Sequence, residues 1–377
     1  MSFLDYALEQ IIDKNNLLLK VDKIVNWNKV SGLLDKKLGK DRDTAVVGRI
    51  PYKHLSLFKV LLLQQWHNLS DPKMEEALKT RIDFMWFSNF GLATNDFMVP
   101  DETTICRFRN KLIKHKLLDK LLKLVNTGLE ENSLKVKICN GAILDATLIE
   151  SSVNSRAKPN LIVEDRNENN DDNDNGSNSK VSNTNKLLKA NEQNDIEIDK
   201  DAKWLKKGKD TVFGYKNFVI TDATDGYIET VDVTPANTSE VTHLEDVLST
   251  IQNNQNIKVL FTDKGYTSKK NSDLLQSKGI GNGIMDKAFR NTPLTKKQKN
   301  RNKRISKTRY IVERTNATTA VRFNFKRTKY IGIAKVKAQA LLVAMAHNLL
   351  KAANKIKLIN SFTRITLPKI CDFGLFA

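Results

Sequence analysis

The chain has 377 residues, 40% of them hydrophobic, and its 62 lysine and arginine residues against 43 aspartate and glutamate residues give a net charge of +19. That length and composition suit two or three folded domains and exclude a chain that is disordered throughout. Three cysteines without paired spacing exclude a disulfide framework and a thiolate zinc site, and they favour a reducing compartment.

The chain begins with MSFLDYALEQ, which is acidic where a secretory signal would be basic and then continuously apolar. No later run reaches the roughly 20 apolar residues that a membrane span needs. We therefore expect a cytoplasmic protein that does not bind membranes. The five histidines are scattered, so we expect packed or surface side chains from them and no histidine metal cluster.

Residues 52–130 predict a series of helices. The segment HLSLFKVLLLQQWHNL, residues 54–69, is strongly apolar. The next helix restarts with Ser70 or Asp71 as its N-cap and Pro72 in its first turn. This part of the chain is therefore expected to be all-helical.

A further helix is predicted in VPDETTICRFRNKL. Its candidate N-caps are Asp101, Thr103 and Thr104, and its early turns carry the basic residues Arg107, Arg109 and Lys111. Two interpretations of these basic residues are open, a helix that contacts DNA and the solvated face of a helical domain. Spacing alone favours neither.

An apolar run of strand length leads into Asp145. The composition then changes, with ten asparagines between Asp165 and Asn194 and no aromatic residue. Because such a segment cannot bury enough surface to offset its ordering entropy, we expect a disordered insert at about residues 160–203. It carries 11 acidic against 6 basic residues and could shield a cationic surface, but a tolerated surface insertion is the simpler interpretation.

Two β-rich runs follow around Asp225 and Gly226, a dipeptide typical of hairpin turns. Together with the Asp145 strand they predict an antiparallel three-stranded start. A helix capped by Ser239 and a buried strand running into Asp263 come next, and a further helix after that. The apolar sequence AKVKAQALLVAMAHNLLKAANKI predicts a closing helix.

The positive charge is concentrated towards the C-terminus. Residues 287–357 contain 20 basic residues and one acidic residue, Glu313, so this segment alone accounts for the whole net charge. Such a surface favours binding of a polyanion. Glu313 lies on a predicted helix that begins at Ser306, where it either pairs with Arg309 or acts on the polyanion.

Asp145 and Asp263 each follow an apolar strand, at the edge where an open α/β sheet places its functional groups. With Glu313 they would offer Mg²⁺ the hard oxygen ligands that phosphodiester chemistry requires. Each also has a structural interpretation, a turn cap for either aspartate and an ion pair for Glu313. Asp222 has a similar local pattern, but its position beside the hairpin turn favours a capping role.

Seven motifs occur in a characteristic order over roughly residues 45–357. They are LLLQQWHNLSDPKMEEALKTRIDFMWF, VPDETTICRFRN, LDATLIESS, GYKNFVITD, DVTPAN, TDKGY and ISKTRYIVER. In this order they resemble bacterial DDE transposases of the insertion-sequence-five type. The resemblance implies an α/β fold, an RNase H-like mixed sheet with flanking helices, preceded by an all-helical N-terminal domain.

The resemblance also implies roles for particular residues. Asp145, Asp263 and Glu313 match the catalytic triad that binds the metal, usually two Mg²⁺ ions, for which Mn²⁺ can substitute. Arg309 matches the arginine four residues before the family glutamate, which contacts DNA or organises the active site.

The chain departs from the family pattern around this glutamate. Asn316, Ala317 and Ala320 stand where an aromatic residue, a glycine and a lysine are usual, and Ser306 replaces a tyrosine. Arg322 or Lys326 could take over the phosphate contact of the missing lysine.

Three domains are expected: a helical DNA-binding and dimerisation domain at 1–134, a catalytic domain at 135–357 and a tail at 358–377.

The expected function is a transposase that binds the terminal inverted repeats of its insertion sequence. It would act as a homodimer on double-stranded DNA at the nucleoid and use divalent metal to cleave and transfer strands. A catalytically inactive DNA-binding relic or repressor is the alternative, and a stand-alone nuclease of the same core fold is a third.

Overall fold

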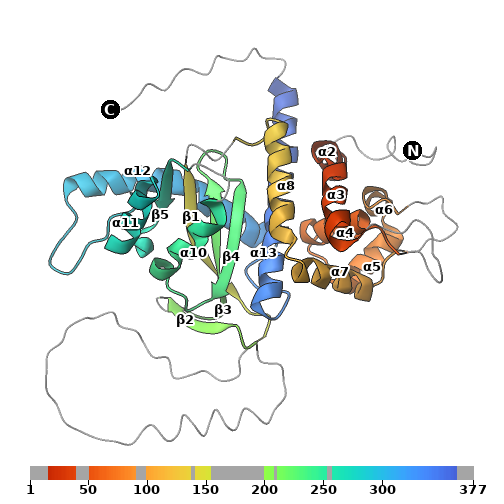
Figure 1. Ribbon diagram of the computed structural model, residues 1–377, viewed down its shortest axis with the longest axis horizontal. Helices are drawn as coiled ribbons and strands as arrows, with labels where there is room; N and C mark the ends of the chain where they lie inside the picture. Colours follow the sequence, from red (N-terminus) through yellow and green to blue (C-terminus); the bar gives the residue numbers. More distant parts are fainter. Residues whose placement is uncertain are drawn as a thin grey trace, which may run out of the picture.

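A computed structural model of the chain describes residues 16–39, 51–90, 99–136, 141–153, 199–207, 210–252 and 257–362. Figure 1 shows a helical region on one side and a β-sheet with its own helices on the other, with the long helices α8 and α13 between them. Within the described residues, no helix combines the length and the hydropathy that crossing a membrane would require.

The region before residue 135 is built of helices in the ranges that the structure describes. They are α2 Leu17–Ile24, α3 Trp27–Leu38, α4 His54–Trp66, α5 Asp71–Thr80, α6 Ile82–Phe87, α7 Glu102–Lys114 and α8 Leu118–Glu131. The Ser70 hydroxyl accepts the Lys73 N–H at 3.4 Å, and the Asp101 carboxylate accepts the Thr104 N–H at 2.6 Å. These caps satisfy donors that a helix start leaves free, so they set where α5 and α7 begin.

The sheet contains six strands among the described residues. They are β1 Ala142–Glu150, β2 Lys203–Lys207, β3 Asp210–Asp222, β4 Ile228–Pro235, β5 Val259–Thr262 and β6 Gly281–Ile284. Their order is β4, β3, β1, β5, β6, with β2 beside the first half of β3. β3 is antiparallel to β1 and β4, whereas β1, β5 and β6 are parallel. This mixed sheet confirms the expected fold class, and β2 and β6 are strands that the sequence did not predict.

Helices cover both faces of this sheet. They are α10 Glu240–Gln252, α11 Lys269–Ser277, α12 Lys296–Arg322 and α13 Ile333–Phe362, with a short 3₁₀ turn, η2, at Lys264–Tyr266. On one face, Leu144, Phe218 and Leu260 of the sheet pack with Leu244 of α10 and Leu275 of α11. Because side chains alternate along a strand, the intervening residues face α12 and α13 on the other side.

The turn between β3 and β4 is the predicted hairpin, and it rests against α12. Gly226 has a φ of +77°, and a Cβ there would lie 2.7 Å from a side-chain carbon of Ile311, so only glycine fits. The buried carboxylate of Asp222 accepts the N–H groups of Asp225 and Tyr227. Asp222 therefore caps the turn, as its position in the sequence indicated.

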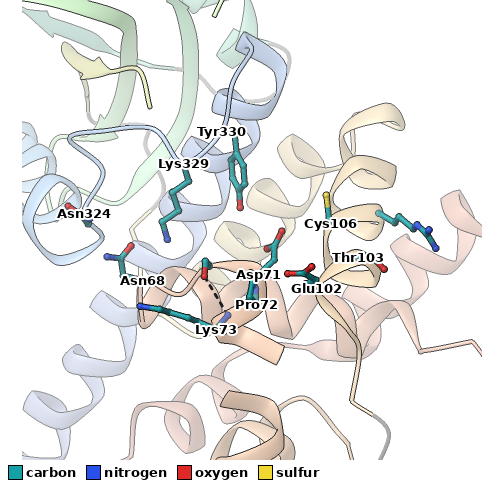
Figure 2. A pocket seen from close by; sticks show the side chains of 12 residues that line it. Asn68, Asp71, Pro72, Lys73, Glu102, Thr103, Cys106, Asn324, Lys329 and Tyr330 are labelled. Atoms are coloured by element: carbon teal, nitrogen blue, oxygen red, sulfur yellow. Dashed lines mark hydrogen bonds between the residues drawn. The ribbon is translucent and has the colours of Figure 1, made fainter. Parts of the chain in front are cut away.

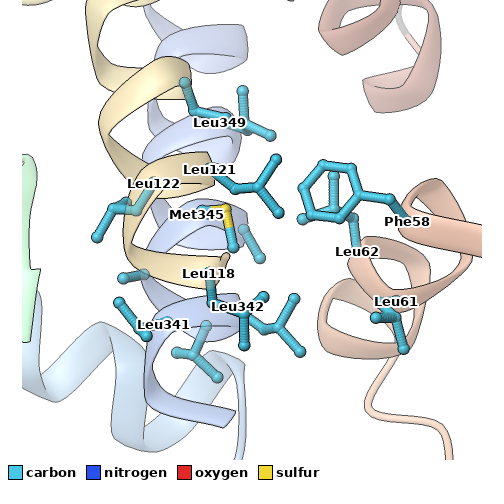
Figure 3. Packing of buried hydrophobic residues seen from close by; sticks show 14 of the residues in the cluster. Phe58, Leu61, Leu62, Leu118, Leu121, Leu122, Leu341, Leu342, Met345 and Leu349 are labelled. Carbon is cyan, nitrogen blue, oxygen red and sulfur yellow. The ribbon is translucent and has the colours of Figure 1, made fainter. Parts of the chain in front are cut away.

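The last helix, α13, belongs to both parts of the molecule. Among the described residues, one apolar cluster extends from the N-terminal helices through α13 to the face of β3 and β4. Figure 3 shows Leu342 and Met345 of α13 packing near Leu121 of α8 and near Phe58 and Leu62 of α4. The expected boundary at residue 134 thus divides the chain but does not divide the core.

Buried polar groups fix α13 against its neighbours. The indole N–H of Trp66 donates to the carbonyl of Ala346 at 2.9 Å. The amide of Asn348 accepts the N–H of Ile228, and it donates to the carbonyl of Ile228 and to the side-chain oxygen of Asn126. Since an unpaired polar group in a core is costly, these bonds specify how α8, α13 and β4 align.

The expected end of the insert at residue 203 is wrong. Asp199 is 1% exposed and accepts hydrogen bonds from the hydroxyls of Ser151 and Tyr215, and Ala202 is also buried. These contacts order the chain just before β2. The remainder of the expected insert lies outside the described residues.

Two other expected boundaries also differ. The helix that carries Glu313 begins at Lys296 rather than at Ser306, because Thr295 and Gln298 form a reciprocal capping box ten residues earlier. The expected tail at 358 begins within α13, which continues to Phe362.

Replacing Leu342 with alanine tests the shared core. Leu342 is fully buried, so Leu342→Ala should lower the free energy of unfolding by about 2 to 5 kcal/mol. Urea titrations followed by tryptophan fluorescence and by circular dichroism should give one coincident transition, because the helical region and the sheet share this core. Val321→Ala, at a side chain that is 75% exposed, is the control and should change the value by less than about 0.5 kcal/mol. Equal effects of the two substitutions would contradict the assignment.

Candidate active site

Asp145 and Asp263 are brought together by two neighbouring parallel strands. Asp145 lies in β1, Asp263 directly follows β5, and the backbone places Ile143 opposite Phe261. Continuing this register by two residues places Asp145 opposite Asp263. The two side chains therefore lie on the same face of neighbouring strands that are about 4.8 Å apart. Asp145 is the fourth residue of its strand and not the last, because β1 continues past β5 to pair with β3. The sequence prediction that Asp145 ends the strand is wrong.

Asp145 is held by two side chains of α12. The guanidinium of Arg309 donates to one carboxylate oxygen at 2.9 Å, and the amide of Asn316 donates to the other at 2.9 Å. Burial raises the pKa of Asp145, and this effect outweighs the lowering by Arg309; the nearby charge of Asp263 raises the pKa further. The ionised form of Asp145 is therefore less favourable than that of a fully exposed aspartate, despite its two donors.

Arg309 also links Asp145 to Glu313. Its guanidinium lies 3.8 Å from a carboxylate oxygen of Glu313, one helical turn further along α12. Glu313 is 53% exposed, whereas Arg309 is 12% exposed and its buried Nε has no hydrogen-bond partner. Glu313, the third predicted acid, is thus linked to Asp145 by the guanidinium of Arg309, which contacts both carboxylates.

The carboxylate oxygens of these acids are suitable ligands for a divalent cation, but their present positions do not form a complete metal site. Among the residues that the structure describes, no three histidine, cysteine, aspartate or glutamate side chains are placed to hold one metal ion. Asp145 and Asp263 nevertheless offer adjacent hard oxygens whose mutual repulsion a cation would relieve. The predicted triad is therefore brought together as a close pair, with Glu313 beside it.

Sequence reasoning missed a further acid, Glu240. A Cβ on Gly265 would lie 2.4 Å from a carboxylate oxygen of Glu240 and 2.9 Å from one of Asp263. The two carboxylates therefore flank the same point, and the glycine leaves room for them. The only sequence signal was an acid at the start of a helix, three residues after DVTPAN, and an acid there is usual in any helix.

The hydroxyl of Tyr266 lies near the same acids. It is buried and has no hydrogen-bond partner within the described structure. Burial raises the pKa of this phenol well above its usual value, and the charges of Glu240, Asp145 and Asp263 raise it further. Tyr266 therefore stays protonated and presents an O–H donor to an acidic cluster.

Three of the six predicted DNA-contacting residues are exposed, and Arg309 is half-buried in the site described above. Arg107 on α7 is exposed, as are Arg322 at the end of α12 and Lys326 just beyond it. Lys111 is half-buried, with its ammonium 3.4 Å from the carbonyl of Leu38. These positions permit contact with a ligand and do not by themselves identify one.

The structure places Arg109 inside the protein, so its side chain lies on neither a DNA-contacting nor a solvated face of α7. Arg109 is 3% exposed, donates to both carboxylate oxygens of Asp71 at 2.8 and 2.6 Å, and lies 4.3 Å from the ring centre of Tyr330. Residues two positions apart point to nearly opposite sides of a helix, so Arg107 faces solvent while Arg109 faces the core. Arg109 therefore joins α5 and α7 to the segment after α12.

Comparison with known proteins places both parts of the chain. The family described as "Transposase DDE domain" matches residues 142–349, and the family described as "Transposase domain (DUF772)" matches residues 6–111. One relative, described as "Transposase for insertion sequence element IS1106" from Neisseria meningitidis serogroup B, is 38% identical over 250 residues. That alignment covers 66% of this chain and 78% of the relative.

The buried ion pair of Asp71 should be sensitive to pH. Burial alone would raise the pKa of Asp71, but hydrogen bonds from Arg109 and Gln64 lower it overall. Asp71 therefore stabilises the fold above its unfolded-state pKa, and this contribution is lost as the pH falls. Asp71→Asn should reduce the free energy of unfolding by about 2 to 4 kcal/mol at neutral pH.

Urea titrations between pH 7 and about pH 3 should show that deficit shrinking as the wild-type carboxylate protonates. Asp273→Asn, at an exposed position of α11, is the matched control and should have little effect at any pH. A deficit that is constant across this range would contradict the ion-pair assignment.

Proposed function

This chain belongs to the bacterial insertion-sequence transposases that carry a DDE domain, and on that premise we propose that it cuts DNA at the ends of its own element and joins them to a target. The observation that carries the proposal is that Asp145 and Asp263 are level on parallel strands, against the helix that begins the basic segment. Such a site combines ligands for cations with a surface for a polyanion.

Asp145 and Asp263 would hold the divalent cations, with Glu313 completing the set, and we propose Mg²⁺ with Mn²⁺ as a substitute. When bound, two such ions activate the attacking oxygen and stabilise the leaving oxygen of a phosphodiester. Glu240 lies near Asp263, and its other carboxylate oxygen is 3.4 Å from the ammonium of Lys216. In our proposal it strengthens cation binding without replacing a member of the triad.

Arg309 and Asn316 would orient the reacting groups. Both donate to Asp145, so its two oxygens are fixed in direction by α12. A phosphate that enters the site would compete with Asp145 and Glu313 for the same guanidinium, which places Arg309 to contact DNA as well as the acids. Asn316, one of the departures from the family pattern, thereby acquires a function in this chain.

The first half of α12 supplies a surface for the DNA backbone. Its exposed basic residues are Lys296, Lys297, Lys299, Lys303, Arg304 and Lys307. Contacts of this kind neutralise phosphates and release counterions, so they bind DNA without reading its sequence. We propose that residues 1–134 recognise the terminal inverted repeats while residues 135–357 carry out cleavage and strand transfer. An element has two ends, so we propose a homodimer with one protomer at each.

Replacing Asp145 with asparagine should separate cleavage from binding. Asp145→Asn keeps the size of the side chain and a hydrogen-bond acceptor but removes a charged cation ligand. It should abolish cleavage of a duplex carrying the element end in Mg²⁺, while gel-shift affinity for that duplex stays within a few-fold of wild type. Glu245→Gln, at a 56% exposed position of α10, should cleave normally.

Normal cleavage by Asp145→Asn would remove this residue from the mechanism. Wild-type protein that binds the element end but does not cut it in Mg²⁺ or Mn²⁺ would instead support an inactive DNA-binding relic, the alternative that Ala320 suggests. Cutting that ignores the end sequence would support a stand-alone nuclease.

Replacing Glu240 with glutamine tests the fourth acid. Because the substitution removes a negative charge close to Asp263, it should weaken Mn²⁺ binding by about 10-fold or more in calorimetric titrations without DNA. Glu245→Gln on the same helix again serves as the control and should bind Mn²⁺ as wild type does. Unchanged affinity in Glu240→Gln would show that this carboxylate has no part in cation binding.

A further inference from the structure

A pocket of about 900 Å³ lies where the helical region meets the segment that follows α12. Figure 2 shows Lys329 and Tyr330 on one side of it, Asn68 and Lys73 near the start of α5 on another, and Cys106 of α7 on a third. Its lining therefore comes from parts of the chain more than 200 residues apart. Its size is at the upper end of the range for pockets that bind ligands.

The pocket has an excess of positive charge. Lys73 and Arg107 line it and are exposed, and Lys329 contributes a partly buried ammonium. Of the two acids in the lining, Asp71 is already bound through both oxygens by Arg109, and Glu102 is exposed to solvent. Three cations thus line the pocket against one carboxylate, that of Glu102, which Arg109 does not pair with.

The partly buried ammonium of Lys329 also lacks full compensation of its charge. Burial lowers the pKa of its ammonium, and Arg109 lowers it further, although the charge of Asp71 acts in the opposite direction. The ammonium lies 3.5 Å from the carbonyl of Leu69, a neutral partner. An anion in the pocket would relieve this unfavourable arrangement.

Contacts within the protein join the walls of the pocket to one another. Arg109 pairs with Asp71 and lies over the ring of Tyr330, so α5, α7 and the segment after α12 are held together. The backbone N–H of Lys329 is also fixed, by the side chain of Gln339 on α13. The flat ring of Tyr330 and the ring of Pro72 provide apolar surface between the cations.

The pocket lies beyond the C-terminal end of α12, the helix that carries Glu313. Nine residues separate Glu313 from Arg322, which is about 13 Å of helix, or about four nucleotides of a DNA strand. Arg322 is exposed at the end of this interval, Lys326 is exposed four residues beyond it, and Asn324 lines the pocket itself. Basic or polar groups therefore connect the candidate active site with the pocket.

We propose that this pocket binds the phosphodiester backbone of DNA, taking one nucleotide unit several steps away from the bond that is cut. The inference rests on the proposed function, since the DNA must be engaged at Asp145 and Asp263. The cations contact the phosphate, and Tyr330 and Pro72 face the sugar and base. A DNA contact was one of two interpretations open for Arg109 from the sequence. In this proposal Arg109 instead holds Asp71 and Tyr330 in place in the pocket wall.

Salt dependence tests the phosphate contacts. Dissociation constants for a duplex carrying the element end should be measured at several NaCl concentrations for Lys73→Ala and Arg107→Ala. Each substitution should weaken binding and reduce the slope of log K against log salt by about 0.9, the value for one lost phosphate contact. Lys270→Ala is the matched control, because Lys270 is 78% exposed on α11, on the opposite face of the sheet. Its slope should equal that of wild type.

Cys106 gives a second measurement that needs no substitution. It lines the pocket and is a free thiol, so bound duplex should slow its alkylation by N-ethylmaleimide, followed by peptide mass spectrometry. Unchanged salt slopes together with unprotected Cys106, in protein that still binds and cuts DNA, would overturn the pocket assignment and leave the proposed function intact. Failure of the wild-type protein to bind DNA would overturn both.

Discussion

The burial of α13 between the N-terminal helices and the sheet is the constraint on which the rest of the structure depends. Its apolar side chains join the N-terminal helices and the face of β3 and β4 in one continuous core. The polar bonds of Asn348 then set the alignment of α8 and β4 against it. As a consequence, the acids of the sheet and the helix starts of the N-terminal region occupy fixed positions relative to one another. The DNA engagement that we propose at both places depends on this shared core.

The acids of the candidate active site lie close together and partly away from solvent, where their negative charges contribute little to the stability of the fold. Asp145 is half-buried near Asp263, and desolvation raises its pKa despite the arginine at 2.9 Å. A carboxylate that is retained under such conditions is expected where function requires charge. Arg309 and Asn316 then act as structural partners that keep the carboxylate oriented. The same α12 that supplies them carries exposed lysines and arginines, so one helix holds the carboxylate and presents the surface that we propose for DNA.

Two arginines on α7 show how burial divides residues of one type between functions. Arg107 remains in solvent, where its charge is available to a phosphate. Arg109 is enclosed by Asp71 and Tyr330, where its charge is already neutralised. In the sequence the two are equivalent candidates, two positions apart in the same basic stretch. The helical turn alone places one towards the pocket and the other within the structure that supports it.

Much of this protein could be predicted from the sequence because the relevant rules act over a few residues. Ser70 and Asp101 set helix starts, Asp225 and Gly226 set a hairpin, and the count of charges located the cationic segment. The closeness of Glu240 to Asp263, the burial of Arg109 and the pocket around Lys329 could not be predicted in this way. They depend on strand register and helix packing between residues far apart in the chain, and no local pattern encodes which side chain becomes a neighbour's partner. The sequence by itself determined which chemical groups were available, and the tertiary structure decided which of them meet.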